Sequence, residues 1–422
     1  MIQNTGVESR RAAIFALSRW LATGEFPDRL IAASSDHGFV MDLVYGCARR
    51  RRELEWMLAQ CVKRMPSGET RAALLVGALQ ILHRPSIPGY AAIFATVEAA
   101  KLASRRSAGF VNGVLRSLLR RREELRQELE KQSLGIRTSH PDVLVKRWVE
   151  RFGGDEAARL CAWNNEPAST CLACLPGRDA PDAVLAALDA AGVQAVPHSA
   201  RPDCLVLPHG VPPTSLPGFA EGRFVVQDPA TLDAIGLLDL APGQNVLDAC
   251  AAPGGKTVQI AARLRNSGSL LALDVHGDRL ALLHENLARF GFESFVRCGV
   301  GDAADPRCEA LEDHAFDRIL LDVPCSNTGV LCRRPDARWR FSLPRLAKLR
   351  AVQSALLRAN FARLRPGGRL VYSTCSLEPE ENRLLVDEFL AGEPAARLVG
   401  TTERIPTRDD TDGAFAAAII RD

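Results

Sequence analysis

From residue 224 onward, short apolar runs alternate with stretches that have helical spacing. The clearest runs span residues 245–247, 269–273, 319–321 and 369–372. This alternation is typical of a mostly parallel sheet with helices on both faces. Ligands bind such sheets at the carboxyl ends of the strands. Functional residues are therefore expected directly after each run.

The first third of the chain has a different pattern. Between Glu8 and Gln132 the apolar residues recur at helical spacing, which predicts an all-α domain of five to seven helices. Residues 1–140 hold 22 Lys and Arg against 13 Asp and Glu, whereas the rest of the chain holds 31 against 37. The arginine runs at 49–52 and 120–122 are therefore either a phosphate-binding surface or a solvated helical face.

The stretch from residue 140 to about 230 mixes one helical segment with Pro, Gly and short strand candidates. We interpret it as a small α/β connector, so that the predicted domains span residues 1–135, 136–230 and 231–422. Cys171 and Cys174 have metal-ligand spacing, but no second Cys or His pair follows at the distance typical of zinc sites. We expect two thiols on a strand here, and no metal.

The cysteines and the apolar content also bear on where the chain works. Its 12 cysteines are scattered singly along 422 residues, which favours free thiols over a disulfide framework. The amino terminus lacks the apolar core of a signal peptide, and no apolar run is long enough to cross a membrane. We therefore expect a cytoplasmic monomer without a membrane partner.

A glycine-rich loop, Asp248-Ala249-Cys250-Ala251-Ala252-Pro253-Gly254-Gly255-Lys256-Thr257, follows the first apolar run. Paired glycines let the backbone approach a ligand, and the helix that follows offers free N–H groups. The loop nearly matches the phosphate-binding loop of nucleotide hydrolases, which makes a hydrolase one alternative. Cys250 stands where that loop needs glycine, however, and Pro253 removes a backbone donor.

Acidic residues follow the next two apolar segments. Asp274 lies about twenty residues after Lys256, where an acidic residue binds ribose hydroxyls in Rossmann-type sites. A helix-capping Asp is the alternative. Asp302 could accept a hydrogen bond from an adenine amino group or serve as a turn residue.

Two cysteines are expected at the same edge of the sheet. The run at 319–321 leads into Asp322 and Cys325, and the run at 369–372 leads into Cys375, with a helix expected to begin near Pro379. Cytosine C5 is a poor nucleophile. A thiolate that adds to C6 makes C5 enamine-like, so that C5 can displace a methyl group from a sulfonium. A second group must later assist elimination.

These segments resemble those of known families. Residues 251–256, 322–326 and 373–382 are similar, in the same order, to motifs of the Sun/NOL1/NOP2 RNA 5-methylcytosine methyltransferases, and residues 43–49 and 109–116 resemble segments of NusB-like RNA-binding domains. The resemblance implies an α/β, Rossmann-like methyltransferase domain that depends on S-adenosylmethionine. An all-α NusB-like domain and the small α/β connector would precede it.

The resemblance also implies an activity and the residues that carry it. The chain would methylate C5 of one cytosine in 16S rRNA that is unassembled or partly assembled. Cys375 would be the nucleophile, and Cys325 would assist release. Arg279 would lie near the cofactor. On the substrate side we expect Arg333, Arg334, Arg338 and Trp339, and a surface loop packed by Trp339 is the alternative. The cofactor-binding residues would be Cys250, Ala251, Ala252, Pro253, Gly254, Gly255, Lys256, Asp274, Asp302 and Asp322.

A non-enzymatic RNA-binding or ribosome assembly factor with a relic cofactor site is the other alternative. It predicts affinity for RNA without methyl transfer, and the presence of both Cys325 and Cys375 argues against it. The sequence leaves open the target nucleotide, a role for other RNAs and the group that accepts the C5 proton.

Overall fold

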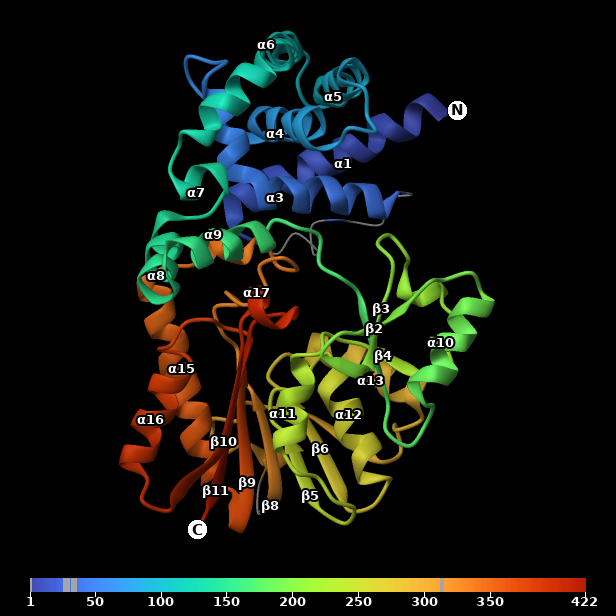
Figure 1. Ribbon diagram of the computed structural model, residues 1–422, viewed down its shortest axis with the longest axis vertical. Helices are drawn as coiled ribbons and strands as arrows, with labels where there is room; N and C mark the ends of the chain where they lie inside the picture. Colours follow the sequence, from blue (N-terminus) through green and yellow to red (C-terminus); the bar gives the residue numbers. More distant parts are fainter. Residues whose placement is uncertain (1, 26–30, 32–35, 312–314) are drawn as a thin grey trace. The chain divides into compact units, whose positions relative to one another are not determined.

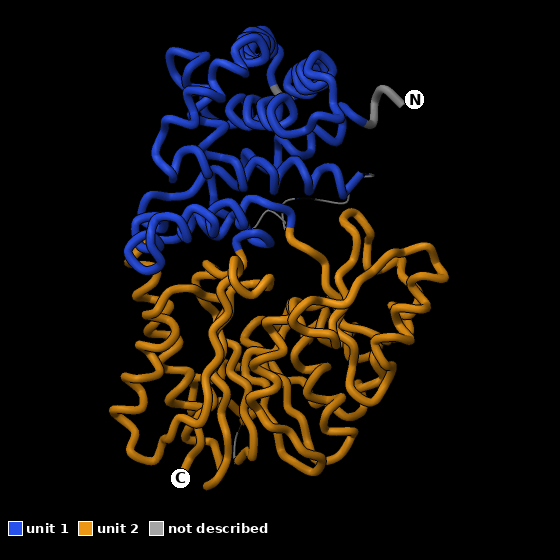
Figure 2. Tube along the Cα trace, viewed as in Figure 1, with its two compact units in different colours: residues 1–167, 331–341 blue, residues 168–330, 342–422 orange. Residues whose placement is uncertain are grey.

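The computed structural model describes residues 2–25, 31, 36–311 and 315–422. The chain forms two compact units (Figure 2): residues 1–167 with 331–341, and residues 168–330 with 342–422. The predicted domain boundaries near residues 135 and 230 stay a prediction, because compact units and sequence domains are different divisions. No helix among the described residues is long and apolar enough to cross a membrane.

Unit 1 is built from helices (Figure 1), as its sequence spacing predicts. In chain order they are α1 (Ile2–Thr23), α3 (His37–Ala59), α4 (Gly68–His83), α5 (Gly89–Ala103), α6 (Arg105–Glu130), α7 (Leu134–Arg137), α8 (Asp142–Phe152), α9 (Gly154–Trp163) and the short α14 (Ala337–Arg340). The last of these belongs to a segment, residues 331–341, that the chain contributes to unit 1 long after leaving it.

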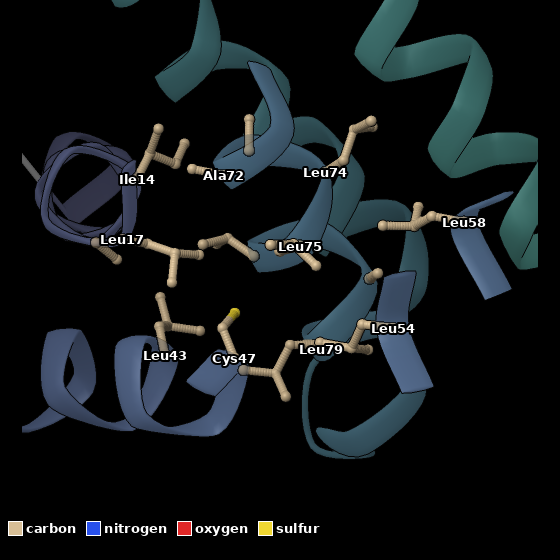
Figure 3. Packing of buried hydrophobic residues seen from close by; sticks show 14 of the residues in the cluster. Ile14, Leu17, Leu43, Cys47, Leu54, Leu58, Ala72, Leu74, Leu75 and Leu79 are labelled. Atoms are coloured by element: carbon tan, nitrogen blue, oxygen red, sulfur yellow. The ribbon is translucent and has the colours of Figure 1, made fainter. Parts of the chain in front are cut away.

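Helix α4 forms the centre of this unit. Every residue from Ala72 to Leu82 is buried, and a helix that is apolar all round must be enclosed by others. Helices α1, α3, α5 and α6 enclose it. Figure 3 shows Leu17 of α1 and Leu43 of α3 packed around Leu75 and Leu79 of α4. The expected all-α domain is confirmed.

Unit 2 begins with a small antiparallel sheet in the order β2-β3-β1-β4. Its strands are β1 (Cys171–Cys174), β2 (Val196–His198), β3 (Arg201–Val206) and β4 (Phe224–Val226). Helix α10 (Pro181–Ala190) packs Val184 and Leu188 against this sheet. The expected small α/β element is therefore present, and Cys171 and Cys174 lie buried on β1 without a disulfide bond between them.

The larger part of unit 2 is built around a second sheet, which among the described residues has seven strands in the order β10-β11-β9-β8-β5-β6-β7. Strands β5 to β9 are parallel, β11 pairs antiparallel with β9, and β10 pairs antiparallel with β11. The strands are β5 (Asn245–Asp248), β6 (Ser269–Asp274), β7 (Val296–Val300), β8 (Phe316–Asp322), β9 (Leu364–Thr374), β10 (Ala396–Arg404) and β11 (Ala414–Arg421). The predicted Rossmann-like, mostly parallel sheet is confirmed.

Helices cover both faces of the large sheet (Figure 1). Helices α11 (Thr231–Leu237), α12 (Gly255–Leu264) and α13 (Gly277–Phe290) pack on one face, and α15 (Leu343–Phe361) and α16 (Arg383–Gly392) on the other. The short α17 (Pro406–Asp409) precedes β11. Successive residues of a strand point to opposite faces, so Leu320 joins the first core and Leu321 the second.

Two features of this sheet position the site. The strand order reverses between β5 and β8, which lie side by side, and ligands bind at such switch points beyond the carboxyl ends of the strands. The helix expected to begin near Pro379 begins at Arg383. Residues 378–382 instead form a turn, in which Asn382 donates to the backbone oxygen of Ser376 at 2.7 Å.

Candidate active site

The glycine-rich loop connects β5 to α12 along a strongly constrained path. Gly254 has φ +105°, and a Cβ there would lie 2.4 Å from Leu283 Cδ1, so both the backbone conformation and the space require glycine. The Ala251 amide donates to Leu273 O at 2.9 Å. The chain thus lays residues 250–254 across the carboxyl ends of β5 and β6, and Gly255 begins the helix.

Asp274 joins this loop to the end of β6. Its carboxylate accepts hydrogen bonds from the amides of Ala252 at 3.1 Å and His276 at 2.9 Å. Arg279 reaches the same carboxylate at 3.6 Å and donates to Ala252 O. The structure therefore brings Asp274 and Arg279 to the loop, as expected from their place in the sequence.

Asp302 lies after β7, one residue beyond Gly301, whose amide donates to Asp274 O at 3.1 Å. The Asp302 side chain is exposed and accepts from the Ala304 amide at 2.8 Å. This is the geometry of a turn aspartate. The exposed carboxylate still lies at the same edge of the sheet as Asp274.

Lys256 and Asp322 form an ion pair between the first turn of α12 and the end of β8. Their Nζ and Oδ2 atoms are 2.7 Å apart, and Ser373 on β9 donates to the other oxygen of Asp322 at 3.1 Å. Burial by itself would lower the pKa of Lys256, but the charge and hydrogen bond of Asp322 outweigh it and raise that pKa. Lys256 therefore stays cationic, and its ammonium also interacts electrostatically with Cys375.

Asp248 was not among the predicted site residues, although it ends β5 at the switch point. Its side chain is fully buried, and Thr257 donates to its Oδ2 at 2.7 Å. Its Oδ1 has no hydrogen-bond partner within the described part of the chain. Burial above all raises the pKa of Asp248 to about 7. A buried polar residue at the end of a strand was the signal that could have identified it.

The two predicted catalytic cysteines lie together. Their Sγ atoms are 3.3 Å apart, although 50 residues separate them in the chain. Cys325 is buried and Cys375 is partly exposed. The hydrogen bond with Cys375, followed by burial, raises the pKa of Cys325 far above its ordinary value. The more accessible Cys375 is thus the better placed of the two to attack a ligand, while Cys325 stays protonated and can donate a proton.

Asn327 is a second residue that the sequence reasoning missed. The Cys375 thiol donates to its Oδ1 at 3.2 Å, and its Nδ2 donates to Cys325 O at 3.0 Å. Two residues further on, the Gly329 amide donates to Cys375 O at 3.0 Å. A Cβ on Gly329 would lie 2.3 Å from Gly413 O, so only glycine fits where these loops meet. No motif position signals such a contact.

The prediction that Arg338 faces the substrate is wrong, whereas Trp339 packs against the core of the helical unit, as the alternative predicted. The Arg338 guanidinium is fully buried in unit 1 and donates to Asn165 Oδ1 and Asn164 O, both at 2.9 Å. Trp339 Nε1 donates to Ala48 O at 2.6 Å. Both side chains anchor residues 331–341 within the helical unit through hydrogen bonds to backbone carbonyl groups and to Asn165.

No group of three potential metal-ligating side chains occurs among the residues that the structure describes. The residues gathered at the sheet edge are instead two thiols, an ion pair, a buried carboxylate and a glycine loop at a helix N-terminus. Such an arrangement can bind a nucleoside-like ligand beside a sulfur nucleophile.

Comparisons with known proteins agree with this arrangement. Residues 235–420 match the model of the 16S rRNA methyltransferase RsmB/F family. Over 400 residues, 92% of this chain, the chain is 36% identical to the ribosomal RNA small subunit methyltransferase B of Citrobacter koseri, of which it covers 92%. The protein of the same name from Salmonella typhi is also 36% identical, with 92% of this chain and 91% of that protein covered. The chain belongs to the RsmB/F family of 16S rRNA methyltransferases.

Two further models match the parts that precede the methyltransferase domain. The NusB family matches residues 7–120, and a ferredoxin-like domain of RsmF/B-like methyltransferases matches residues 140–214. The resemblance to NusB-like domains is thereby confirmed. Among solved structures, that of PH0851 covers 98% of this RsmB/F-family chain and 99% of its own, with a TM-score of 0.81 and 26% identity.

Proposed function

We propose that this chain methylates C5 of a cytosine in 16S rRNA, with S-adenosylmethionine as methyl donor and a covalent bond between Cys375 and C6 of the base. The pair of thiols 3.3 Å apart, next to the loop of a methyltransferase family, carries this proposal. Alkylating an unreactive pyrimidine carbon requires a nucleophile at C6 and a group that acts on release, and two adjacent cysteines supply both.

The residues of the loop suit S-adenosylmethionine. The oxygen of Asp248 that has no partner among the described residues is a buried polar atom that a ligand group can satisfy. Asp274, Asp302 and Asp322 follow three of the strands and offer acceptors for ribose and adenine groups. Residues 250–256 would hold the cofactor's remaining parts by their backbone. When bound, S-adenosylmethionine supplies a methyl group on a sulfonium.

In the proposed reaction, the Cys375 thiolate adds to C6 and thereby activates C5. Lys256, whose ammonium interacts with Cys375, stabilises the thiolate. After methyl transfer, a base removes the C5 proton, the electron pair of that C–H bond restores the C5–C6 double bond, and Cys375 leaves C6 as a thiolate that can be protonated. Cys325, buried against Cys375 and held as a thiol, assists this elimination.

The target cytosine has to leave its stack before it can meet Cys375. Unassembled or partly assembled rRNA offers such a base more readily than a regular duplex. Residues 1–135, as a NusB-like RNA-binding domain, and the connector 136–230 would select the RNA, and residues 231–422 would carry out the transfer. The protein would meet this RNA as a cytoplasmic monomer.

Transfer of labelled methyl from S-adenosylmethionine to unmodified 16S rRNA tests the proposal. We expect label in 5-methylcytosine at one position with the wild type, and at least a thousandfold less with Cys375→Ala, because the nucleophile is then missing. Cys298→Ala, at a free cysteine on β7, is the matched control and keeps the wild-type rate. RNA binding without any transfer would favour an assembly factor instead.

A further inference from the structure

Glu381 lies in the turn between Cys375 and α16, and its side chain is fully buried. Four donors converge on its carboxylate. Oε1 accepts from the Ser326 amide and from Gln353 Nε2, both at 2.9 Å. Oε2 accepts from the hydroxyl of Ser326 and from that of Ser376, the latter at 2.6 Å. Hydrogen bonds to a carboxylate are roughly twice as strong as neutral ones.

The donors are placed in a particular way along the chain. Ser326 directly follows Cys325, and Ser376 directly follows Cys375. A single carboxylate therefore binds the serine that follows each of the two cysteines in the sequence. Gln353 of α15 donates to Oε1, which also accepts from the Ser326 amide. Gln353 donates to Pro324 O at 2.9 Å as well, which ties the helix to the loop of Cys325.

The turn that carries Glu381 is itself held rigidly. Tyr372 on β9 donates its hydroxyl to Glu381 O at 2.7 Å, and Thr374 donates to Asn382 Oδ1 at 2.6 Å. Glu381 thus reaches the two loops from a backbone that the sheet fixes. With all four acceptor positions filled, neither oxygen of the carboxylate is left to exchange a proton with a nucleobase.

We propose that Glu381 is a positioning residue that sets the separation of the Cys325 and Cys375 thiols. It acts through Ser326 and Ser376 and touches neither sulfur atom nor substrate. Its importance for catalysis rests on the proposed function, since both thiols must reach the same base in turn. The geometric claim does not depend on that function.

Thiol cross-linking measures the separation directly. Diamide takes up two hydrogens as two neighbouring thiols become one disulfide, and fragment-ion mass spectrometry assigns the Cys325–Cys375 bridge. We expect the wild-type protein to form it readily and Glu381→Ala to form it about tenfold more slowly or worse, because all four hydrogen bonds to the carboxylate are lost. Glu388→Ala, on the exposed side of α16 where Glu388 pairs with Arg350, is the matched control and cross-links at the wild-type rate.

Glu381→Gln separates positioning from acid–base chemistry. A glutamine can accept from the Ser326 amide and Gln353 through its oxygen and donate to the two hydroxyls through its nitrogen, so the geometry survives while the charge is lost. We expect this variant to cross-link and turn over within about threefold of the wild type. In Glu381→Ala, kcat falls about tenfold or more while KM for RNA is unchanged.

If Glu381→Ala does not fold, the double variant Ser326→Ala with Ser376→Ala replaces it and is expected to slow cross-linking in the same direction. A folded Glu381→Ala protein that cross-links and turns over like the wild type overturns the proposal, as does a Glu381→Gln protein that is as impaired as Glu381→Ala. If the wild type transfers no methyl but the order of cross-linking rates holds, the positioning role stands and the proposed function falls.

Discussion

At the scale of single residues, Asp248 lies in an environment that is unfavourable for a charge. It is buried at the end of β5, with one oxygen bonded to Thr257 and the other unpaired. Burial is the main reason why its pKa rises to about 7, and the nearby charges of Asp322 and Asp274 add to this. Lys256 acts in the opposite direction but already pairs with Asp322.

This environment predicts how stability depends on pH. The folded state holds a proton on Asp248 up to about pH 7, whereas the unfolded chain releases it near pH 3.8. Between these values the folded state binds more protons, so the Asp248 contribution to the free energy of unfolding falls as pH rises. Asn cannot ionise. The free energy of unfolding of Asp248→Asn, measured with urea relative to the wild type, should therefore rise by about 3 kcal/mol between pH 5 and pH 8.

The control for this comparison is Asp305→Asn, at an exposed carboxylate that pairs with Arg307 on the surface. Its stability relative to the wild type should stay nearly constant over the same interval. Equal pH dependence of Asp248→Asn and the wild type would contradict a raised pKa at Asp248.

At the scale of elements, residues 331–341 have a structural role that their basic composition does not predict. They are basic and follow the loop of Cys325, which suggests a contact with RNA, yet Arg338 is enclosed in unit 1 and bonded to carbonyl oxygens and Asn165. Burial lowers the pKa of Arg338 to about 9, which leaves it charged at neutral pH. Arg338 is thus the anchor that holds residues 331–341 inside the helical unit.

Removing that anchor should destabilise the helical unit. Arg338→Met keeps much of the side-chain volume but leaves the oxygens of Ser139, Asn164 and Asn165 without this donor. We expect the free energy of unfolding, measured with urea, to fall by about 3 kcal/mol. Arg307→Met, at a side chain that is 87% exposed, is the control and should change it by less than about 0.5 kcal/mol. A loss equally small for Arg338→Met would mean that residues 331–341 do not depend on this anchor.

At the scale of the whole molecule, the sequence predicted what depends on local order. Each strand run, the loop at 248–257 and each cysteine motif lies within one short stretch of sequence. Because ligands bind at the carboxyl ends of parallel strands, the loop and the motifs could be placed at one edge of the sheet. It could not show that Glu381 bonds to both cysteine loops, that Asn327 meets the Cys375 thiol or that Arg338 is buried. These contacts join residues from separate parts of the chain. The residue type alone does not show whether such a side chain is exposed or buried.

In the proposed reaction, Cys375 bonds to the RNA base and Cys325 helps to release it. The most direct measurement is the recovery of a covalent protein–RNA complex after Cys325→Ala is incubated with S-adenosylmethionine and unmodified 16S rRNA, with the attached residue identified by mass spectrometry. We expect a complex that accumulates and carries the nucleotide on Cys375, and no complex when Cys325→Ala is combined with Cys375→Ala. A nucleotide on another residue, or methylation and release by Cys325→Ala at the wild-type rate, would contradict the proposed reaction.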